Sequence, residues 1–233
     1  MKVRPSTPAA RKRSHQPSIQ LAAVAELPTR SGPFRIVAFS PDANGDEHIA
    51  LVHGRVRDEE DVPVRVHSEC LTGDVLGSLR CDCRAQLEQA LERIAEMPRG
   101  IVLYLRQEGR GIGLTNKIRA YALQDNGHDT VDANALLGFA DDARDYRVAA
   151  DMLRALGVRS VKLMTNNPRK VDGLQRHGVR VSERLPHATT PTRQNAAYLL
   201  TKQKRSGHWL GLREVAPEPK GAPAQESPST TSA

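Results

Sequence analysis

Apolar residues in the first third of the chain fall into short runs that are typical of β-strands. Phe34–Phe39 and Ile49–Val52 flank a polar segment that contains Asn44-Gly45, and this pattern predicts a hairpin. Val62–Val66 predicts a further strand, which delivers His67–Cys70 at its end. The first part of the chain is therefore expected to be rich in β-structure.

Helical and strand patterns alternate in the remainder of the chain. From Cys83 onward apolar residues recur at helical spacing until Pro98, and the continuous apolar run Ile101–Leu105 is typical of a buried strand. The later predicted elements are a helix over Lys117–Asp125, a helix from about Asp141 to Leu156, a strand at Val161–Met164, a helix over Arg169–His177 and a short strand at Val179–Val181. This order predicts an α/β fold in which helices flank a mixed sheet.

Composition and the lack of long apolar segments limit where the protein works. Hydrophobic residues make up 39% of the 233 residues, but no apolar run approaches the roughly 20 residues that span a bilayer. No hydrophobic signal segment opens the chain. These features predict a cytoplasmic protein with reduced thiols and no membrane partner. The Arg-rich, acid-free start also resembles an organelle transit peptide, and this alternative stays open here.

The net charge of +7 is unevenly distributed along the chain. Residues 1–20 carry +5 and residues 214–233 carry −2, which leaves +4 for residues 21–213. Both terminal segments are rich in Pro, Ser, Ala and charge, so we expect disordered tails on either side of one folded domain over 21–213. Aromatic residues for base stacking are scarce, which argues against a nucleic-acid partner. The modest positive surplus favours a polyanionic small molecule.

All three cysteines lie in one short window, as Cys70, then ten residues, then Cys81-Asp82-Cys83. Thiolates select zinc, and three protein ligands leave one position open for a water molecule. Such a water loses its proton near neutral pH, which suits hydrolytic chemistry. The alternative is three buried, reduced cysteines that act as small hydrophobes. The polar neighbours Arg80, Asp82 and Arg84 favour the metal site.

Two segments that follow predicted strands have features of anion-binding sites. In Arg106–Gly113, three glycines at alternate positions allow close backbone approach, and Arg110 between them can contact phosphate oxygens. The spacing matches neither a dinucleotide fingerprint nor a Walker loop, and an ordinary flexible turn would look the same. In Thr165–Pro168, Asn167 is a good N-cap with proline at the first helical position. This segment predicts either an anion site or only a well-capped helix.

Five motifs occur together and in order, and they closely resemble the GTP cyclohydrolase II family from about Ala22 to Gly211. The motifs are His67–Asp74, Ser78–Cys83, Arg106–Gly113, Asn116–Tyr121 and Thr165–Pro168. The resemblance implies opening of the guanine imidazole ring of GTP, with release of formate and pyrophosphate. The implied product is 2,5-diamino-6-ribosylamino-4(3H)-pyrimidinone 5′-phosphate, formed in the first step of riboflavin biosynthesis. One Zn²⁺ per subunit, Mg²⁺ on the triphosphate and a homodimer are also implied.

The resemblance assigns roles to matching positions of this chain. Cys70, Cys81 and Cys83 match the zinc ligands. The positions that match GTP contacts are Arg65, Val66, His67, Ser68, Glu69, Gln86, Glu108, Gly109, Arg110, Thr130, Thr165 and Lys170. The catalytic positions are Asp142, which matches the proton acceptor, Arg144, which matches a proposed nucleophile at the α-phosphorus, and Tyr121, which lies near the metal in the family.

Some questions about these roles stay open at this point. A guanidinium is protonated in proteins, so Arg144 is either a nucleophile activated by a base such as Asp142 or a group that stabilises phosphate charge. Arg84 stands where many family members have glycine, and its side chain would contact a phosphate or face solvent. Asp132 replaces the usual glutamate in the segment after Thr130. A single-activity form is expected, because about 20 residues precede the match.

Two other functions compete with the GTP cyclohydrolase II hypothesis. One is a paralogue that opens the ring without releasing formate, or that acts on another base, although Tyr121 argues for formate release. The other is a non-catalytic, zinc-containing nucleotide-binding module. Asp142, Arg144 and Lys170 argue against that module, since simple binding has little use for all three.

Overall fold

The structure is a computed structural model that describes residues 19–140, 142 and 144–212, without the side chains of residues 130 and 131. The predicted tails lie outside the described residues, apart from positions 19 and 20. Ile19 is buried in the core, so the packed part of the chain begins before the predicted boundary at residue 21.

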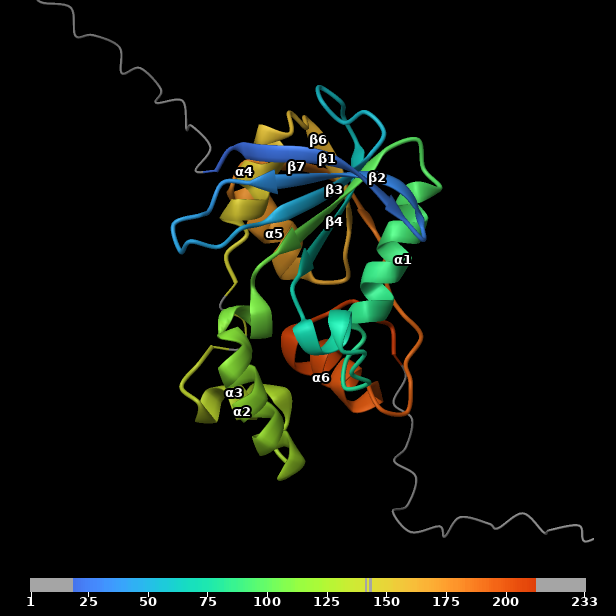
Figure 1. Ribbon diagram of the computed structural model, residues 1–233. Coiled ribbons are helices and arrows are strands. Elements are labelled where there is room, and N and C mark those ends of the chain that lie inside the picture. The colour runs from blue at the N-terminus through green and yellow to red at the C-terminus, as the bar shows by residue number, and fades with distance from the viewer. Residues whose placement is uncertain (1–18, 141, 143, 213–233) are drawn as a thin grey trace, which may run out of the picture.

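A seven-stranded mixed sheet forms the centre of the fold, as the sequence predicted (Figure 1). In spatial order its strands are β1 (Leu21–Thr29), β2 (Gly32–Phe39), β3 (Ile49–His53), β5 (Gly100–Leu105), β4 (Val62–Ser68), β6 (Ser160–Met164) and β7 (Arg180–Leu185). The first four strands are antiparallel neighbours, whereas β5, β4, β6 and β7 run parallel. The carboxyl ends of β4 and β5 therefore meet at one edge of the sheet.

Helices lie on both faces of the sheet and beyond its parallel strand ends (Figure 1). The α-helices are α1 (Cys83–Ala95), α2 (Gly113–Asp125), α3 (Thr130–Leu136), α4 (Arg147–Ala155), α5 (Pro168–Arg176) and α6 (Ala196–Ser206). One turn of π-helix, η1 (Leu71–Val75), follows β4, and one 3₁₀ turn, η2 (Glu108–Gly111), follows β5. In Figure 1, α2, α3 and α6 lie beyond the ends of β4 and β5.

The central strand β5 shows how the sequence pattern builds the core. Alternate residues of a strand point to opposite faces, and both faces of β5 are buried. Ile101 and Leu103 belong to the large apolar cluster that includes α4. Val102 packs in the second cluster with Ala90 and Ile94 of α1. A continuous apolar run is therefore what this position requires.

Most predicted elements are present, and the differences have local causes. The helix expected from Asp141 begins only at Arg147. Before it, the carboxylate of Asp142 accepts the N–H of Arg144 and that of Asp145 accepts the N–H of Arg147. Such bonds offer the backbone an alternative to the helix. The last predicted strand, at Val179–Val181, is longer, since β7 runs to residue 185.

One strand and two α-helices were not predicted: β1, α3 and α6. Most of β1 is exposed on both faces, so its sequence lacks the alternation that marks a half-buried strand. The expected hairpin is confirmed as the antiparallel pair β2–β3, and the carboxylate of Asp42 accepts the N–H groups of Asn44 and Asp46 in its turn. Among the described residues, no helix is both long enough and apolar enough to cross a membrane.

Replacing Leu103 by alanine tests the importance of β5 for stability. Leu103 is fully buried, whereas Leu136 on α3 is 61% exposed. Leu103→Ala is expected to lower the free energy of unfolding by ~2–5 kcal/mol, because it leaves a cavity in the core. The matched change Leu136→Ala is expected to stay within ~0.5 kcal/mol of wild type. Urea unfolding followed by circular dichroism measures both, and equal effects would contradict this description of the core.

Candidate functional site

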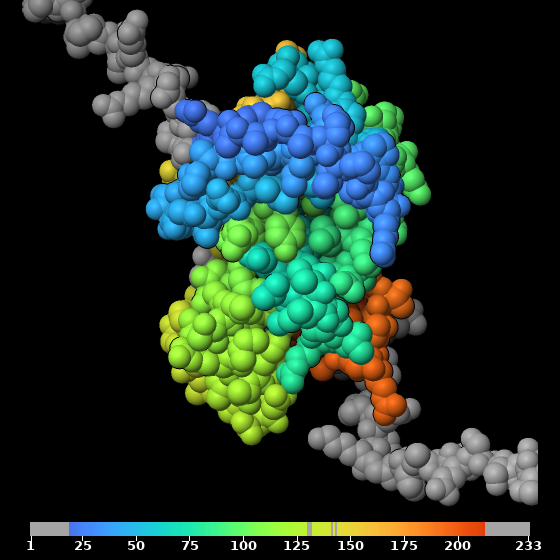
Figure 2. All heavy atoms as spheres, viewed as in Figure 1, coloured from blue at the N-terminus to red at the C-terminus, as the bar shows by residue number. Residues whose placement is uncertain are grey.

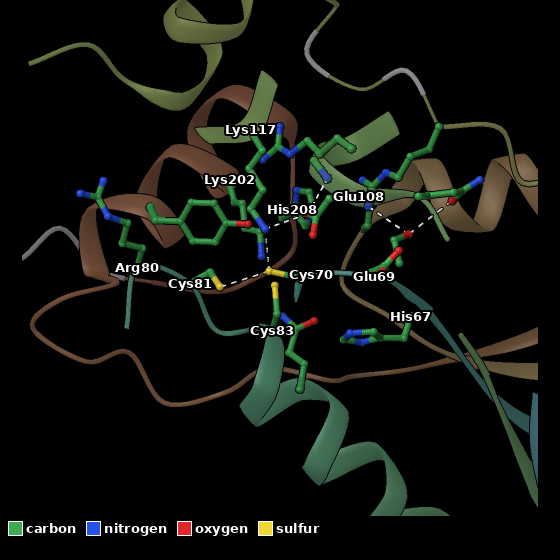
Figure 3. Close-up of a pocket in the computed structure, with 18 of the residues that line it drawn as sticks. His67, Glu69, Cys70, Arg80, Cys81, Cys83, Glu108, Lys117, Lys202 and His208 are labelled. Atoms are coloured by element: carbon green, nitrogen blue, oxygen red, sulfur yellow. Dashed lines mark hydrogen bonds and ion pairs between the residues drawn. The ribbon is translucent and has the colours of Figure 1, made fainter. Parts of the chain in front are cut away.

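A cavity lies at the carboxyl ends of β4 and β5, where open α/β sheets commonly bind ligands. Its walls come from β4 and the residues that follow it, the loop before α1, the first turn of α1, the glycine-rich turn η2, α2, α3, the start of α5, and α6 with the segment after it. In Figure 2 the part of the chain around the end of η1, in blue-green, lies at the surface. It lies between the α2–α3 region, in yellow-green, and the C-terminal part of the described chain, in orange. Figure 3 shows the cysteines and several charged side chains gathered in this cavity.

The three cysteines meet in this cavity from three different segments. Cys70 precedes η1, Cys81 lies in the following loop, and Cys83 begins α1. Their sulfur atoms all lie within 4.8 Å of one another, and Cys70 Sγ is 3.7 Å from Cys81 Sγ. No disulfide links them. This donor set fits a thiolate-bound metal such as zinc.

The acidities of the three thiols also fit a cation among them. The pKa of Cys70 is strongly lowered, chiefly by hydrogen bonds from Cys81 and Cys83 and further by Lys117. The pKa of Cys81 is raised to about 11, chiefly through Cys70, and the pKa of Cys83 is raised for the same reason. One thiolate therefore disfavours the next, and a bound divalent cation would remove this penalty.

Gly73 has no side chain, and this allows the sulfur atoms of Cys70 and Cys81 to lie close to its backbone. A Cβ added at this position would lie 2.8 Å from Cys81 Sγ and 3.1 Å from Cys70 Sγ. The neighbouring Asp74 is fixed by three donors, since its carboxylate accepts the N–H of Cys70, the hydroxyl of Tyr104 and the Nε2 of His67, each at 3.0 Å. The π-helical turn thus holds the first ligand in place.

Lys117 and Tyr121 lie one turn apart on α2 and reach the same side of the cysteines. The ammonium of Lys117 lies 3.1 Å from Cys70 Sγ and 2.7 Å from Glu108 Oε1. Glu108 also accepts the N–H of Leu71 through its other oxygen. The hydroxyl of Tyr121 is 3.1 Å from Thr72 Oγ1, and burial raises the pKa of Tyr121. Glu108, expected as a GTP contact, therefore orients both Lys117 and η1.

Two buried cations, Arg65 and Lys170, donate to neutral acceptors and not to carboxylates. Arg65 donates to the carbonyl of Met164 and to the amide oxygen of Gln86. Lys170 donates to the carbonyl of Val66 at 2.7 Å. Burial, together with repulsion from neighbouring cations, lowers the pKa of Lys170 well below its usual range. Burial lowers the pKa of Arg65 to about 10. An anion in the cavity would compensate both charges.

Asp142 and Arg144 form a two-pronged ion pair beside these cations. Arg144 Nε lies 2.7 Å from Asp142 Oδ1, and a terminal nitrogen of the same guanidinium lies 2.6 Å from Oδ2. Burial acts to lower the pKa of Arg144, but Tyr146 and Asp142 outweigh it, so the pKa is raised. Burial acts to raise the pKa of Asp142, but Arg144 outweighs it and the pKa is lowered. The pair is therefore fully ionised at neutral pH.

The glycine-rich turn has a strained backbone at its centre. Gly109 and the non-glycine residue Arg110 both have φ of 61°. Such a conformation costs an arginine ~1–2 kcal/mol, and residues of this kind cluster at functional sites. A terminal nitrogen of Arg110 lies 3.4 Å from Ser206 Oγ on α6. The turn thus brings backbone and a guanidinium to the cavity together.

The start of α5 has the predicted cap. Asn167 Oδ1 accepts the N–H of Arg169 at 2.9 Å, and Pro168 occupies the first helical position. Thr165 is buried, and its hydroxyl accepts the N–H of Asn167. This capping prediction is confirmed, whereas anion binding at the same turn stays a prediction.

The structure brings most of the predicted site residues to one cavity. Those that line it are Arg65, His67, Ser68, Glu69, Cys70, Cys81, Cys83, Gln86, Glu108, Gly109, Arg110, Tyr121, Arg144, Thr165 and Lys170. Val66 contributes its carbonyl to Lys170, Asp142 acts through its contact with Arg144, and the side chain of Thr130 lies outside the described residues. His67 is bonded to Asp74 and is not part of the sulfur cluster. Their roles toward GTP stay predictions.

Several charged residues around the cavity were not predicted, chiefly Asp82, Lys117 and Lys202. Lys117 could have been found from its spacing of four residues to Tyr121 on one helix. Lys202 lies on α6, for which no helix was expected. Arg84 is not among the residues that line the cavity. It is exposed, as one of the two expectations had it, and it also donates to the carbonyls of Asp74 and Val75 at the end of η1.

Comparisons with known proteins agree with this arrangement. Residues 20–186 match the model of the family described as GTP cyclohydrolase II. A GTP cyclohydrolase-2 from Escherichia fergusonii is 56% identical over 198 residues, which cover 84% of this chain and all of that protein. A GTP cyclohydrolase-2 from Tolumonas auensis is 54% identical over 193 residues, or 83% of this chain and 98% of that protein.

More distant or longer proteins also match. The riboflavin biosynthesis protein RibBA from Salinispora arenicola is 52% identical over 90% of this chain, but the match spans only 50% of that protein. A solved two-domain 3,4-dihydroxy-2-butanone 4-phosphate synthase from A. baumannii is 20% identical over 72% of this chain and 40% of that chain. Its TM-score of 0.43 is too low to support an argument.

Gly73→Ala tests whether the sulfur cluster is a metal site. Its new methyl group would occupy the space of Cys81 Sγ and Cys70 Sγ. We expect the purified variant to contain less than half of the wild-type zinc, because the ligands must move apart. Elemental analysis after dialysis measures the zinc, and circular dichroism checks that the variant is folded. A folded variant with the wild-type zinc content would contradict the assignment.

Proposed function

Since the chain belongs to the GTP cyclohydrolase II family, we propose that it hydrolyses GTP to 2,5-diamino-6-ribosylamino-4(3H)-pyrimidinone 5′-phosphate, formate and pyrophosphate. This reaction is the first step of riboflavin biosynthesis. The observation that carries the proposal is the meeting of two features in one cavity: a three-thiol metal site and a group of buried cations. Hydrolysis at the base and at the triphosphate requires both.

The cations support a triphosphate as the ligand. Apart from Lys202, which is paired with Asp82, six Arg and Lys side chains line the cavity against the two carboxylates of Glu69 and Glu108. Arg65 and Lys170, whose pKa values are lowered, lie where phosphate oxygens would restore their full charge. Magnesium arrives with the substrate, because it neutralises part of the triphosphate and helps pyrophosphate to leave.

The cysteines support zinc chemistry at the purine ring. Cys70, Cys81 and Cys83 would hold the ion, and zinc with an open fourth position supplies Lewis-acid activation of water. Tyr121 lines the same cavity as the cysteines, and its hydroxyl is hydrogen-bonded to Thr72. This hydroxyl would donate a hydrogen bond to an atom bonded to the carbon that water attacks. Its raised pKa keeps the hydroxyl protonated for that purpose.

The ion pair of Asp142 and Arg144 supports a role in charge stabilisation. A guanidinium with a raised pKa and a bidentate carboxylate partner has no free lone pair for attack on phosphorus. Arg144 would instead stabilise the charge that develops on the α-phosphate while water attacks. Asp142 keeps the guanidinium in place for this step.

The function is tested by incubating the protein with GTP, Zn²⁺ and Mg²⁺ and measuring formate and pyrophosphate together. We expect about equal amounts of both products. The Cys81→Ser variant is expected to release neither formate nor pyrophosphate and to contain less bound zinc, because serine is a poorer zinc ligand than a thiolate. Consumption of GTP without formate would favour the ring-opening paralogue. Tight binding without consumption would favour the non-catalytic module, and either result would refute the proposal.

Arg144→Ala separates the two halves of the reaction. If Arg144 stabilises charge at the α-phosphate, the variant should open the ring but release pyrophosphate ~100- to 1,000-fold more slowly than wild type. The ring-opened product would then keep its triphosphate, and mass spectrometry of this product measures the outcome. Arg147→Ala, in which an exposed arginine near the site is removed, is the matched control.

Two results would contradict this role for Arg144. A variant that opens no rings at all would favour a covalent link formed before ring opening. A variant that releases pyrophosphate at the wild-type rate would exclude Arg144 from the phosphate step altogether.

A further inference from the structure

Helix α6 lies beyond residue 186, where the match to the family model ends, yet it reaches the cavity. Tyr198 and Lys202 are one helical turn apart on it, and His208 follows its end. All three line the cavity. Figure 3 shows Lys202 and His208 among the side chains around the three cysteines. The C-terminal helix is therefore part of the site and does not merely cover the fold.

Asp82 lies between two of the cysteines, but its side chain does not cap the helix that begins there. It is the N-cap residue of α1, where an aspartate normally accepts N–H groups of its own helix. Here its side chain makes no such bond. The carboxylate instead lies 2.9 Å from Lys202 Nζ and 3.1 Å from the hydroxyl of Thr189, and it accepts the amide of Gln86. In place of a cap, the carboxylate therefore contacts one near residue and two residues more than a hundred positions away.

The Asp82–Lys202 pair is well buried and is held from both sides. The exposed fraction is 2% for the Asp82 side chain and 12% for that of Lys202. The ammonium of Lys202 also lies 4.5 Å from the centre of the Tyr198 ring. At the far end of α6, Arg205 pairs with Asp129 and Asp132, which fixes the helix against α3. Lys202 is thus aimed at the cysteine loop by a firmly anchored helix.

We propose that Lys202 is a positioning residue for the metal centre: by pairing with Asp82, it holds Cys81 and Cys83 at the spacing that one zinc ion needs. The inference rests on the proposed zinc site and adds a residue to it. Asp82 is bonded through its peptide links to both cysteines, so fixing its carboxylate restricts the loop between the two sulfur atoms. Partners that orient metal ligands in this way contribute strongly to metal affinity.

The same network extends from the loop to the cations. Gln86 donates to Asp82 and accepts from Arg65, so its amide orientation is fixed at both ends. Asp82 is thereby linked through Gln86 to Arg65 at the triphosphate side. The charge of Lys202, however, is engaged by Asp82, which distinguishes Lys202 from a group that binds substrate directly.

The experiment measures zinc release from the full-length, zinc-loaded protein into an excess of a chromogenic chelator, in the absence of GTP. Lys202→Met, which removes the charge at similar length, is expected to release zinc ~10- to 100-fold faster than wild type. Asp82→Asn should have the same effect. The double variant should be no faster than either single variant, since both changes break one interaction.

Controls separate a positioning role from a general loss of structure or from substrate binding. Lys204→Met makes the same chemical change at an exposed position two residues further along α6, and it should release zinc at the wild-type rate. Steady-state kinetics of Lys202→Met with saturating zinc should show a lower kcat and a KM for GTP within about twofold of wild type, because its contact is to the loop. Circular dichroism checks that the variants are folded. If Lys202→Met does not fold, the rate of zinc release from Asp82→Asn tests the inference instead.

The outcomes are distinct. Unchanged zinc release in both single variants overturns the inference. So does a raised KM with unchanged kcat and zinc release, which would make Lys202 a substrate contact. A wild-type protein that binds no zinc, or that binds zinc without consuming GTP, instead refutes the proposed function, whatever the variants do.

Discussion

Three sulfur atoms within 4.8 Å of one another cannot all be ionised unless a cation lies among them. This constraint organises the end of the sheet. Lys117 stabilises a first thiolate at Cys70, and the next two thiols then become weaker acids. The proposed zinc ion would supply the positive charge that lets the three thiols ionise together. Carboxylates of the surrounding turns fix the backbone that carries Cys70. Asp74 accepts the N–H of Cys70, and Glu108 accepts the N–H of Leu71.

The half of the cavity around Arg65 and Lys170 has an excess of positive charge. Arg65 and Lys170 are buried against carbonyl and amide oxygens, which stabilise a cation less than a carboxylate does. Burial and repulsion from neighbouring cations lower the pKa of both groups, so a negative charge beside them would favour their ionised forms. Under the proposed function, the triphosphate of GTP would supply a negative charge beside these two cations, and its base would lie toward the sulfur cluster.

The parts of this fold that the sequence predicts are those determined by neighbours in the chain. The strand β5 follows from a continuous apolar run, and the cap of α5 follows from Asn167 and Pro168. The late start of α4 was missed because carboxylates before it bond to nearby N–H groups, a choice that periodicity does not reveal. The clustering of the three cysteines could be predicted because their spacing in the sequence is short, and their sulfur atoms do lie together. The pairing of Asp82 with Lys202 could not, since 120 positions separate them and Asp82 is equally suited to a simple helix cap.

Asp82 also shows how the two halves of the cavity can depend on one another. Its backbone joins two metal ligands, while its carboxylate is bonded to Lys202 and, through Gln86, to Arg65. Buried polar networks are stable only when each member is satisfied, so a shift of one member is felt by the others. Movement of Arg65 toward a phosphate would therefore change the bonding of Gln86, whereas Lys202 would still hold the carboxylate of Asp82. In this arrangement the helix that supplies Lys202 keeps the ligand loop fixed while the cations adjust to substrate.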